Sequence, residues 1–557
     1  MTRPSRIAKR VAPHQQRSIQ TERVRTETRA RKPHHNPYRL DDPAEALAWS
    51  EKWTPLVAFQ LFLYFGFCMI LLSQIPNQIL NPDNLSIIYV MGALGVWRYG
   101  WWFTHWIRAI IYARVAFPKI RARANAFWDS GWRPRRMHFM MTTFREERAT
   151  AEAVVRSICQ EIRDAGVPGT VWIGSSEPED EHTLIEHFKQ VGADCDIELR
   201  IIRQNQPGKR VAIALILRAM SREGLGDNDF IAFMDGDFIL DRGALNLCLP
   251  MFAADPDLHA LTTDEAVVVV GPKWLQSWLS MRFAQRHMAM QSHALSGRVL
   301  TLTGRFSVFR ATHLVSKDFI RLQEADFLDH WLWGKFRFLS GDDKSSWYAL
   351  LKHDVKMLYV PDSRGYTIEH IDGSGWQRMV ENLRRWSGNM LRNGQRAIQL
   401  GPRRMPFFIW WCCVDQRLAI WTMLFSPMLA VAMTLKVGVM FLLAYVAYIA
   451  VTRGLLALVL FQYARRVDLN FIWTLYANQL LNAAVKVYML SRLAKQKWSN
   501  RGNQKQGFAE DGFIELYRTW MARYMTVFAV ASLFLCVMLY SKALTIPNWA
   551  TVKAMFT

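Results

Sequence analysis

The chain has 557 residues, of which 51% are hydrophobic, and 69 Lys and Arg against 47 Asp and Glu give a net charge of +22. This length exceeds that of one simple domain, and the apolar residues gather in long runs near the N-terminus and after residue 400. Basic residues flank these runs and no DNA- or RNA-binding motif appears. We therefore expect membrane lipid and anionic substrates as partners, and no nucleic acid.

The N-terminal part of the chain predicts a tail followed by two membrane spans. Residues 1–50 have the composition of a disordered basic tail that stays in the cytoplasm. Residues 51–115 hold two predicted transmembrane helices, at 54–73 and 85–107, and the first is an uncharged run that can cross about 30 Å of hydrocarbon. The segment 108–136 contains eight Lys and Arg, whereas the linker 74–84 contains none. The positive-inside rule therefore places the domain that follows in the cytoplasm.

Residues 116–375 alternate apolar runs of strand length with amphipathic segments. The runs at 137–144, 170–174, 199–203 and 230–237 are separated by segments of helical pattern. This alternation predicts a mostly parallel sheet with helices on both faces. In such a sheet, ligands bind beyond the carboxyl ends of the strands.

The fourth run ends in two carboxylates that are one glycine apart, Asp235 and Asp237. Carboxylates at this spacing suit Mg²⁺ or Mn²⁺ bound to a diphosphate, because these hard cations take oxygen ligands from the protein and from phosphates. We predict Asp237 as a metal ligand, and Asp235 as a metal ligand or a contact of the donor's ribose and diphosphate. The alternative is an Asp-Gly turn that closes a hairpin.

Four further residues are candidates for binding a nucleotide. Glu146 and Glu177 follow the first two strands, where a base and a ribose would lie, although isolated acids in loops are more often simply solvated. Lys209 and Arg210 follow Gly208 and open a helix, and cations at a helix N-terminus form an anion site. The alternative for this pair is a surface turn.

Two adjacent acids follow a glycine at Gly341-Asp342-Asp343 and precede a helical pattern. An acid at a helix N-terminus is frequently only a cap. In a domain with a second carboxylate cluster, however, it suggests a general base that deprotonates a sugar hydroxyl. We predict Asp343 as this base, with Asp342 as the alternative.

Residues 376–417 predict amphipathic helices at the membrane interface. From 377 to 393, apolar residues recur on one helical face and arginines recur every seven residues on another. We expect Arg385 to bind a departing nucleoside diphosphate, the bidentate contact to which guanidinium is suited, and Trp386 to stack on the acceptor sugar. The alternative is a basic interfacial helix without a catalytic role.

The C-terminal part predicts three more spans. Residues 418–461 hold two, and 524–557 hold a last span and an outer tail. The helix at 470–492, within 462–523, is polar on one side and precedes a basic segment. If it crossed the membrane, that segment would lie outside, so we predict an interfacial helix and five spans. A crossing there would give six.

Taken in order, these motifs resemble those of processive family-2 glycosyltransferases, the group of cellulose, chitin and hyaluronan synthases. The matching residues are Asp235-Gly236-Asp237, Thr303-Gly304-Arg305, Gly341-Asp342-Asp343 and Arg385-Trp386. The resemblance implies an α/β GT-A glycosyltransferase domain inserted between transmembrane helices, a Mg²⁺- or Mn²⁺-bound nucleotide sugar and inverting transfer. Residues 498–502 resemble the family's gating loop, which implies that Arg501 covers the nucleotide.

Longer blocks are similar to bacterial mannuronan synthases, the alginate polymerases, over residues 55 to 540. These blocks are Arg282–His287, Arg298–Arg305, Gly341–Trp347, Gly388–Arg392 and Asp415–Arg417. One departure is Asn382, where the family pattern has Gln or Arg three residues before Arg385. The resemblance therefore implies that Arg385 binds the leaving group and that Trp386 contacts the acceptor. It does not imply a role for Asn382.

This closer resemblance implies a processive, inverting synthase of the bacterial inner membrane, with a cytoplasmic catalytic domain, that polymerises mannuronate from GDP-mannuronate into a secreted β-1,4-linked chain. It also implies a separate cyclic di-GMP-sensing membrane subunit and periplasmic secretion proteins. The alternatives are a related synthase that uses UDP-glucose or UDP-GlcNAc, a non-processive lipid-linked transferase, and a transporter or scaffold. The extra carboxylate of a uronate donor would pair with an arginine, and the candidates are Arg282, Arg286, Arg298 and Arg305. The alternative for each of them is a structural role.

Overall fold

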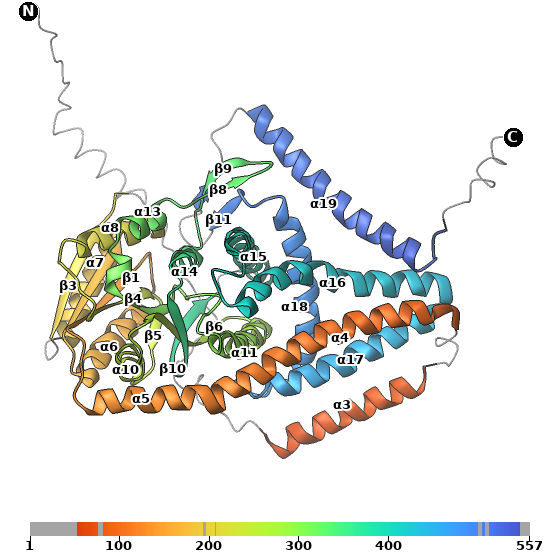
Figure 1. Cartoon of the computed structure of the whole chain (residues 1–557), viewed down its shortest axis with the longest axis horizontal. Coiled ribbons are helices and arrows are strands. Elements are labelled where there is room, and N and C mark those ends of the chain that lie inside the picture. Colours follow the sequence, from red (N-terminus) through yellow and green to blue (C-terminus); the bar gives the residue numbers. More distant parts are fainter. Residues whose placement is uncertain are drawn as a thin grey trace, which may run out of the picture. The chain divides into compact units, whose positions relative to one another are not determined.

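The computed structural model describes residues 53–75, 82–192, 196–205, 208–371, 373–498, 504–506 and 512–545. The predicted basic tail and Arg501 lie outside these residues. In Figure 1 the described chain combines a sheet with helices on both sides and a set of long helices that precede and follow it in the sequence.

The sheet has eight strands in the order β3-β2-β1-β4-β7-β6-β10-β5. Its strands are β1 (Arg136–Thr142), β2 (Gly169–Ser175), β3 (Ile197–Arg203), β4 (Asp229–Asp235), β5 (Phe238–Leu240), β6 (Leu258–Val270), β7 (Phe306–Arg310) and β10 (Lys356–His370). The pairs β1–β2, β2–β3, β1–β4 and β6–β10 are parallel, whereas β7 and β5 run antiparallel to their neighbours. The mostly parallel sheet expected from the sequence is confirmed, with these two strands reversed.

The central parallel strands β1, β2 and β4 are buried along almost their whole length, whereas the edge strand β3 is only partly buried. In β4, Phe230, Ile231, Ala232 and Phe233 are all buried, as expected for a strand covered by helices on both sides. The helices of this domain are α5 (Phe117–Asp129), α6 (Arg148–Ala165), α7 (Pro178–Val191), α8 (Lys209–Met220), α9 (Ala244–Cys248), α10 (Pro250–Ala254), α11 (Lys273–Ala294), α12 (Ala311–Leu314), α13 (Lys317–Glu324) and α14 (Asp342–Lys352). Two small hairpins accompany them, β8 (Phe327–His330) with β9 (Gly334–Arg337) and β11 (Gln496–Trp498) with β12 (Gln504–Gln506).

Four described helices are long and apolar enough to cross a membrane: α3 (Pro55–Ser73), α16 (Phe407–Val437), α17 (Val439–Leu460) and α19 (Gly512–Tyr540). The span expected at 85–107 lies in α4 (Pro82–Ile111), which continues through the π-helical turn η2 (Tyr112–Ala116) into α5 and is not among the four. Inside α4, Arg98 forms a bidentate ion pair with Asp415 of α16, with distances of 2.6 and 3.2 Å. The count of five spans stays a prediction.

Two further helices contact both the sheet domain and the apolar helices. The first, α15 (Gly375–Leu400), starts at Ser374, whose hydroxyl accepts a hydrogen bond from the amide of Gln377. The second, α18 (Asn470–Leu490), packs against α15, α16 and α17 (Figure 1). The indole of Trp278 in α11 donates a hydrogen bond of 2.9 Å to Asn478, and this bond ties the sheet domain to α18.

Candidate active site

The predicted nucleotide-binding acids lie where parallel strands end. The last residue of β4, Asp235, is in register with Thr142 at the end of β1, and Asp237 follows before β5 begins. Glu177 follows β2 and lies 3.2 Å from Arg145, while Glu146 follows β1. Because the carboxyl ends of parallel strands meet at one edge, this edge of the sheet is rich in carboxylates.

Lys209 joins the two aspartate clusters of the sequence. As the first residue of α8, it extends its ammonium to 2.8 Å from Oδ1 of Asp235 and 2.9 Å from Oδ2 of Asp342, and its side chain is only 8% exposed. Gly304 faces the same point, since a Cβ there would lie 3.1 Å from Nζ of Lys209. Residues that are far apart in sequence therefore meet around one buried cation.

The two acids after Gly341 have different electrostatic environments. Gly341 adopts φ +87°, a left-handed conformation that favours glycine, and α14 begins at Asp342. Burial opposes ionisation of Asp342, but Lys209 and Arg210 outweigh it, so its pKa lies below the usual value. Burial and the neighbouring Asp342 raise the pKa of Asp343. The raised pKa suits the base and the lowered one a permanently charged partner of Lys209.

Arg305 provides a second cation for the same carboxylates. Its carbonyl accepts a hydrogen bond from the amide of Asp235 at 3.3 Å, and its guanidinium lies 3.3 Å from Glu265. Burial alone would lower the pKa of Arg305, but Glu265, Asp237, Glu369 and Asp235 raise it. Asp237 is therefore within electrostatic reach of Arg305, in the same cluster as Asp235.

The helix α15 brings Arg385 to this cluster, and Trp386 is the next residue of the helix. Burial lowers the pKa of Arg385, and the groups that act on it electrostatically include Glu369 and Asp343. Its Nη2 donates a hydrogen bond of 3.1 Å to Asn382, the residue at which the chain departs from the family pattern. Trp386 stacks on Trp278 with ring centroids 5.9 Å apart and an angle of 18° between the planes.

Other predicted residues make different contacts from those expected. The guanidinium of Arg210 is buried and donates to the carbonyl of Gln323 and, at 2.8 Å, to the hydroxyl of Ser345, so it braces α14 from inside the domain. Arg298 pairs with the exposed Asp354. Arg286 lies 3.5 Å from Glu265. Arg501 lies outside the described residues.

Two acids of the site were missed in the sequence. Glu265 is inside β6 and Glu369 is near the end of β10, where it lies 2.9 Å from Arg378. Neither residue has the turn or glycine that drew attention to the other carboxylates. The signal that the sequence offered for Glu265 was a pair of acids, Asp264 and Glu265, inside a strand and directly before one alanine and four valines.

The carboxylate edge has the ligand chemistry for a hard divalent cation. Asp235 and Asp237 are half-buried, so part of each side chain remains open to solvent. Carboxylate oxygens at this spacing are ligands that Mg²⁺ and Mn²⁺ take from proteins. Two cations, Lys209 and Arg305, already lie close to these acids. Their presence indicates that the carboxylate cluster attracts positive charge strongly.

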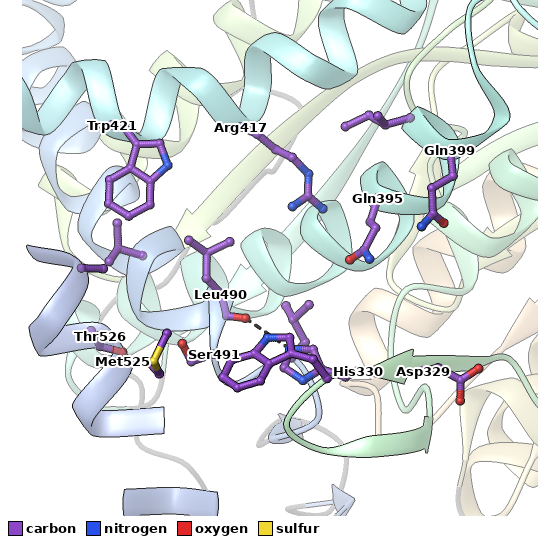
Figure 2. Close-up of a pocket in the computed structure, with 15 residues that line it drawn as sticks. Asp329, His330, Gln395, Gln399, Arg417, Trp421, Leu490, Ser491, Met525 and Thr526 are labelled. Atoms are coloured by element: carbon purple, nitrogen blue, oxygen red, sulfur yellow. Dashed lines mark hydrogen bonds between the residues drawn. The ribbon is translucent and has the colours of Figure 1, made fainter. Parts of the chain in front are cut away.

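A separate cavity of about 630 Å³ lies among α15, α16, α18 and α19, and Figure 2 shows Gln395, Gln399 and Arg417 near its upper edge and Met525 and Thr526 on the opposite side. Trp421 and Leu490 also line it. Its lining does not include Asp235, Asp343 or Trp386. The carboxylate edge, with its convergent charged groups, is therefore the candidate active site.

Comparison with known proteins identifies the family. Residues 134–389 match a family model described as glycosyltransferase like family 2. The glycosyltransferase alg8 of Pseudomonas syringae pv. tomato is 35% identical over 477 residues, which cover 86% of this chain and 96% of the relative. The glycosyltransferase alg8 of Azotobacter vinelandii is 32% identical over 481 residues, which cover 86% and 97%.

Solved structures of other glycosyltransferases are more distant. The mannosyltransferase PcManGT from Pyrobaculum calidifontis, in complex with GDP-Man and Mn²⁺, has a TM-score of 0.40 at 16% identity, over 69% of this chain and 98% of that one. Glucosyl-3-phosphoglycerate synthase from Mycobacterium tuberculosis has a TM-score of 0.29 at 14% identity, over 50% and 82%. The two alg8 relatives, by contrast, align with most of this chain. The chain therefore belongs to the family of the alg8 glycosyltransferases, within glycosyltransferase family 2, which confirms the family expected from its motifs.

Proposed function

We propose that this glycosyltransferase is a processive, inverting synthase of the bacterial inner membrane that joins mannuronate units from GDP-mannuronate into a β-1,4-linked chain and secretes it. One observation carries the proposal: Lys209 joins the two aspartate clusters, and Arg385 acts electrostatically on Asp343 of the second cluster. Donor-side and acceptor-side groups thus share one site, as direct transfer requires.

On the donor side, Asp237 and Asp235 would hold Mg²⁺ or Mn²⁺, which when bound offsets negative charge on the diphosphate. The guanidinium of Arg385 donates to the diphosphate oxygens, where charge builds up as the donor bond breaks. Glu146 and Glu177 lie after β1 and β2 and bind the base and ribose. Arg501 would cover the nucleotide.

On the acceptor side, Trp386 stacks on the terminal sugar and Asp343 accepts the proton of its 4-hydroxyl. The 4-oxygen forms a bond to C1 of the donor sugar, and the bond from C1 to the phosphate oxygen breaks. Its electron pair leaves with GDP, so the configuration at C1 inverts and no covalent enzyme intermediate forms. The raised pKa of Asp343 supports its role as the base, because a stronger base takes this proton more readily.

The same proposal includes the partners implied by the resemblance, namely a cyclic di-GMP-sensing membrane subunit and periplasmic secretion proteins. It rests for them on the similarity of the long sequence blocks rather than on a docking surface. With the catalytic domain in the cytoplasm, the donor is on the side where nucleotide sugars are made. The four apolar helices then provide the membrane part.

The test is to supply purified full-length protein with GDP-mannuronate, GDP-mannose, UDP-glucose or UDP-GlcNAc, and to measure nucleotide release and product size. We expect polymer from GDP-mannuronate alone, and none from the Asp343→Asn variant. Polymer from UDP-glucose or UDP-GlcNAc would instead support the related synthases. Release of GDP with only single-sugar addition would refute processivity.

A further inference from the structure

Two cations, one on α11 and one on α18, have no acidic partner among the described residues. Arg282 of α11 lies with its guanidinium carbon 5.4 Å from the centroid of the Trp386 ring. Lys486 is on α18, within electrostatic reach of Arg282. Both side chains are half-buried, and among the described residues no carboxylate lies within ion-pair distance of either. An anion from outside this part of the chain is therefore the partner that they lack.

The surrounding charges confirm the imbalance. The groups that act electrostatically on Lys486 are Arg282, Arg98 and Asp415. Asp415 already accepts both hydrogen bonds of the ion pair with Arg98. Burial lowers the pKa of Arg282 to about 10, so it still carries its charge at neutral pH. Of these four groups, Arg282, Lys486 and Arg98 are cations, and the one carboxylate, Asp415, is already paired with Arg98.

Such an arrangement is unfavourable unless a ligand supplies negative charge. A buried charge without a partner costs free energy, and an incoming anion offsets that cost. The guanidinium provides a planar fork for a carboxylate and the ammonium provides a compact second charge. The indole of Trp386 lies beside Arg282, and aromatic side chains of this kind stack on pyranose rings. Together these groups match a sugar that carries a carboxylate.

The positions of both cations are fixed by packing. Trp278 is one helical turn from Arg282 on α11, and it both stacks on Trp386 and donates a hydrogen bond to Asn478 of α18. This contact holds α11, α15 and α18 together, and Figure 1 shows α15 and α18 adjacent. Arg282 and Lys486 are thus presented from two helices that cannot move independently.

We propose that Arg282 and Lys486 form a subsite that binds the carboxylate of a uronate residue in the acceptor chain, next to Trp386. The proposal rests on the proposed function, in which Trp386 faces the acceptor. It separates this subsite from the donor, whose diphosphate is bound at the carboxylate edge. It assigns Arg282, which the sequence offered as a candidate for a uronate donor, to the acceptor instead. The other three candidates, Arg286, Arg298 and Arg305, have carboxylate partners.

The test compares two probes that share their ring and linkage and differ in their carboxylates, hexamannuronate and β-1,4-mannohexaose. Their binding to purified full-length protein is measured in the presence of GDP. We expect the wild type to prefer hexamannuronate by about tenfold or more, as for charge-assisted hydrogen bonds. Arg282→Gln and Lys486→Gln should each remove most of this preference, whereas the surface variant Arg242→Gln, whose side chain is 83% exposed, should keep it.

Charge-retaining variants, Arg282→Lys and Lys486→Arg, should recover part of the preference, and GDP binding shows that each variant is folded. Full preference in both glutamine variants would overturn the subsite, as would a wild type that binds the two probes equally. Failure of the proposed function is a different result: the wild type would then release no GDP from GDP-mannuronate. If only the subsite proposal is wrong, the wild type still releases GDP from GDP-mannuronate. The preference for hexamannuronate over mannohexaose is then the same in the wild type and in the glutamine variants.

Discussion

Replacing Lys209 tests whether the two aspartate clusters form one electrostatic unit. In Lys209→Met the side chain keeps most of its length but loses the ammonium that lies 2.8 Å from Asp235 and 2.9 Å from Asp342. The variant leaves the two carboxylates close together without their shared counterion. We expect lower stability of the sheet domain and the loss of glycosyl transfer.

The magnitude follows from the burial of the three side chains. Removing one partner of a buried ion pair costs about 3–5 kcal/mol, and Lys209 and Asp342 are 8% and 7% exposed. Asp235 is 19% exposed and keeps some hydration, so we take the lower value. For a domain of this size, about 3 kcal/mol lowers the thermal midpoint by roughly 6–12 °C.

The effect should depend on pH with a defined sign. Lys209 depresses the folded-state pKa of Asp342, so this contribution to stability is present above the unfolded-state pKa and is lost as pH falls through the folded-state value. The difference between wild type and variant should therefore be full at pH 7 and should shrink as the medium becomes acidic.

The assay is thermal unfolding of the purified proteins in detergent across this pH range. A matched control is Arg218→Met, on the same helix, because Arg218 pairs with Glu324 and these side chains are 39% and 34% exposed. Such a partly exposed pair contributes at most about 1 kcal/mol. Equal midpoints for Lys209→Met and the control, or a difference that does not change with pH, would refute the reasoning.

Three further predictions concern the chemistry. Asp343→Asn should lower transfer by about 10²–10⁴-fold while GDP still binds, and an unchanged transfer rate in this variant would exclude Asp343 as the base. Because the pKa of Asp343 is raised, wild-type activity should begin to fall on acidification at a pH above the usual pKa range of aspartate. Asp237→Ala should abolish the activation of transfer by added Mg²⁺, and wild-type transfer that persists in EDTA would contradict a metal role for this residue. Asn382→Gln should keep activity within about twofold while Asn382→Leu lowers it at least about tenfold through loss of the hydrogen bond to Arg385; equal activity of both variants would show that this bond does not matter.

The family and the parallel part of the sheet were predictable because their signals are local. A buried parallel strand is a continuous apolar run, and the run that ends at Asp235 is one. The contacts of Lys209 with Asp235 and Asp342 could not be predicted, because the three residues are far apart in sequence. Nothing in their local sequence specifies the distances between them. Arg210 shows the opposite case. The sequence places it beside Lys209, but the next position on a helix points to another face, and its side chain turns into the domain.

The membrane boundary was harder to predict because hydropathy averages over a helix and ignores partners. Arg98 makes α4 too polar to be counted among the four apolar helices, yet its charge is matched by Asp415 on α16. A window of sequence cannot contain both members of such a pair, since they are on helices before and after the catalytic domain. The polar residues of α4 thus indicate helix packing as much as exposure to water.

The departure from the family motif at Asn382 becomes intelligible at the level of side-chain contacts. Its amide oxygen accepts from Arg385 at 3.1 Å, and its amide nitrogen lies 3.5 Å from Glu369, which also binds Arg378. Asparagine thus links Arg385 to an acid of β10 within one turn of α15. If Arg385 binds the leaving group as proposed, we expect this short amide bridge to orient its guanidinium, and the predicted effect of Asn382→Leu tests that role.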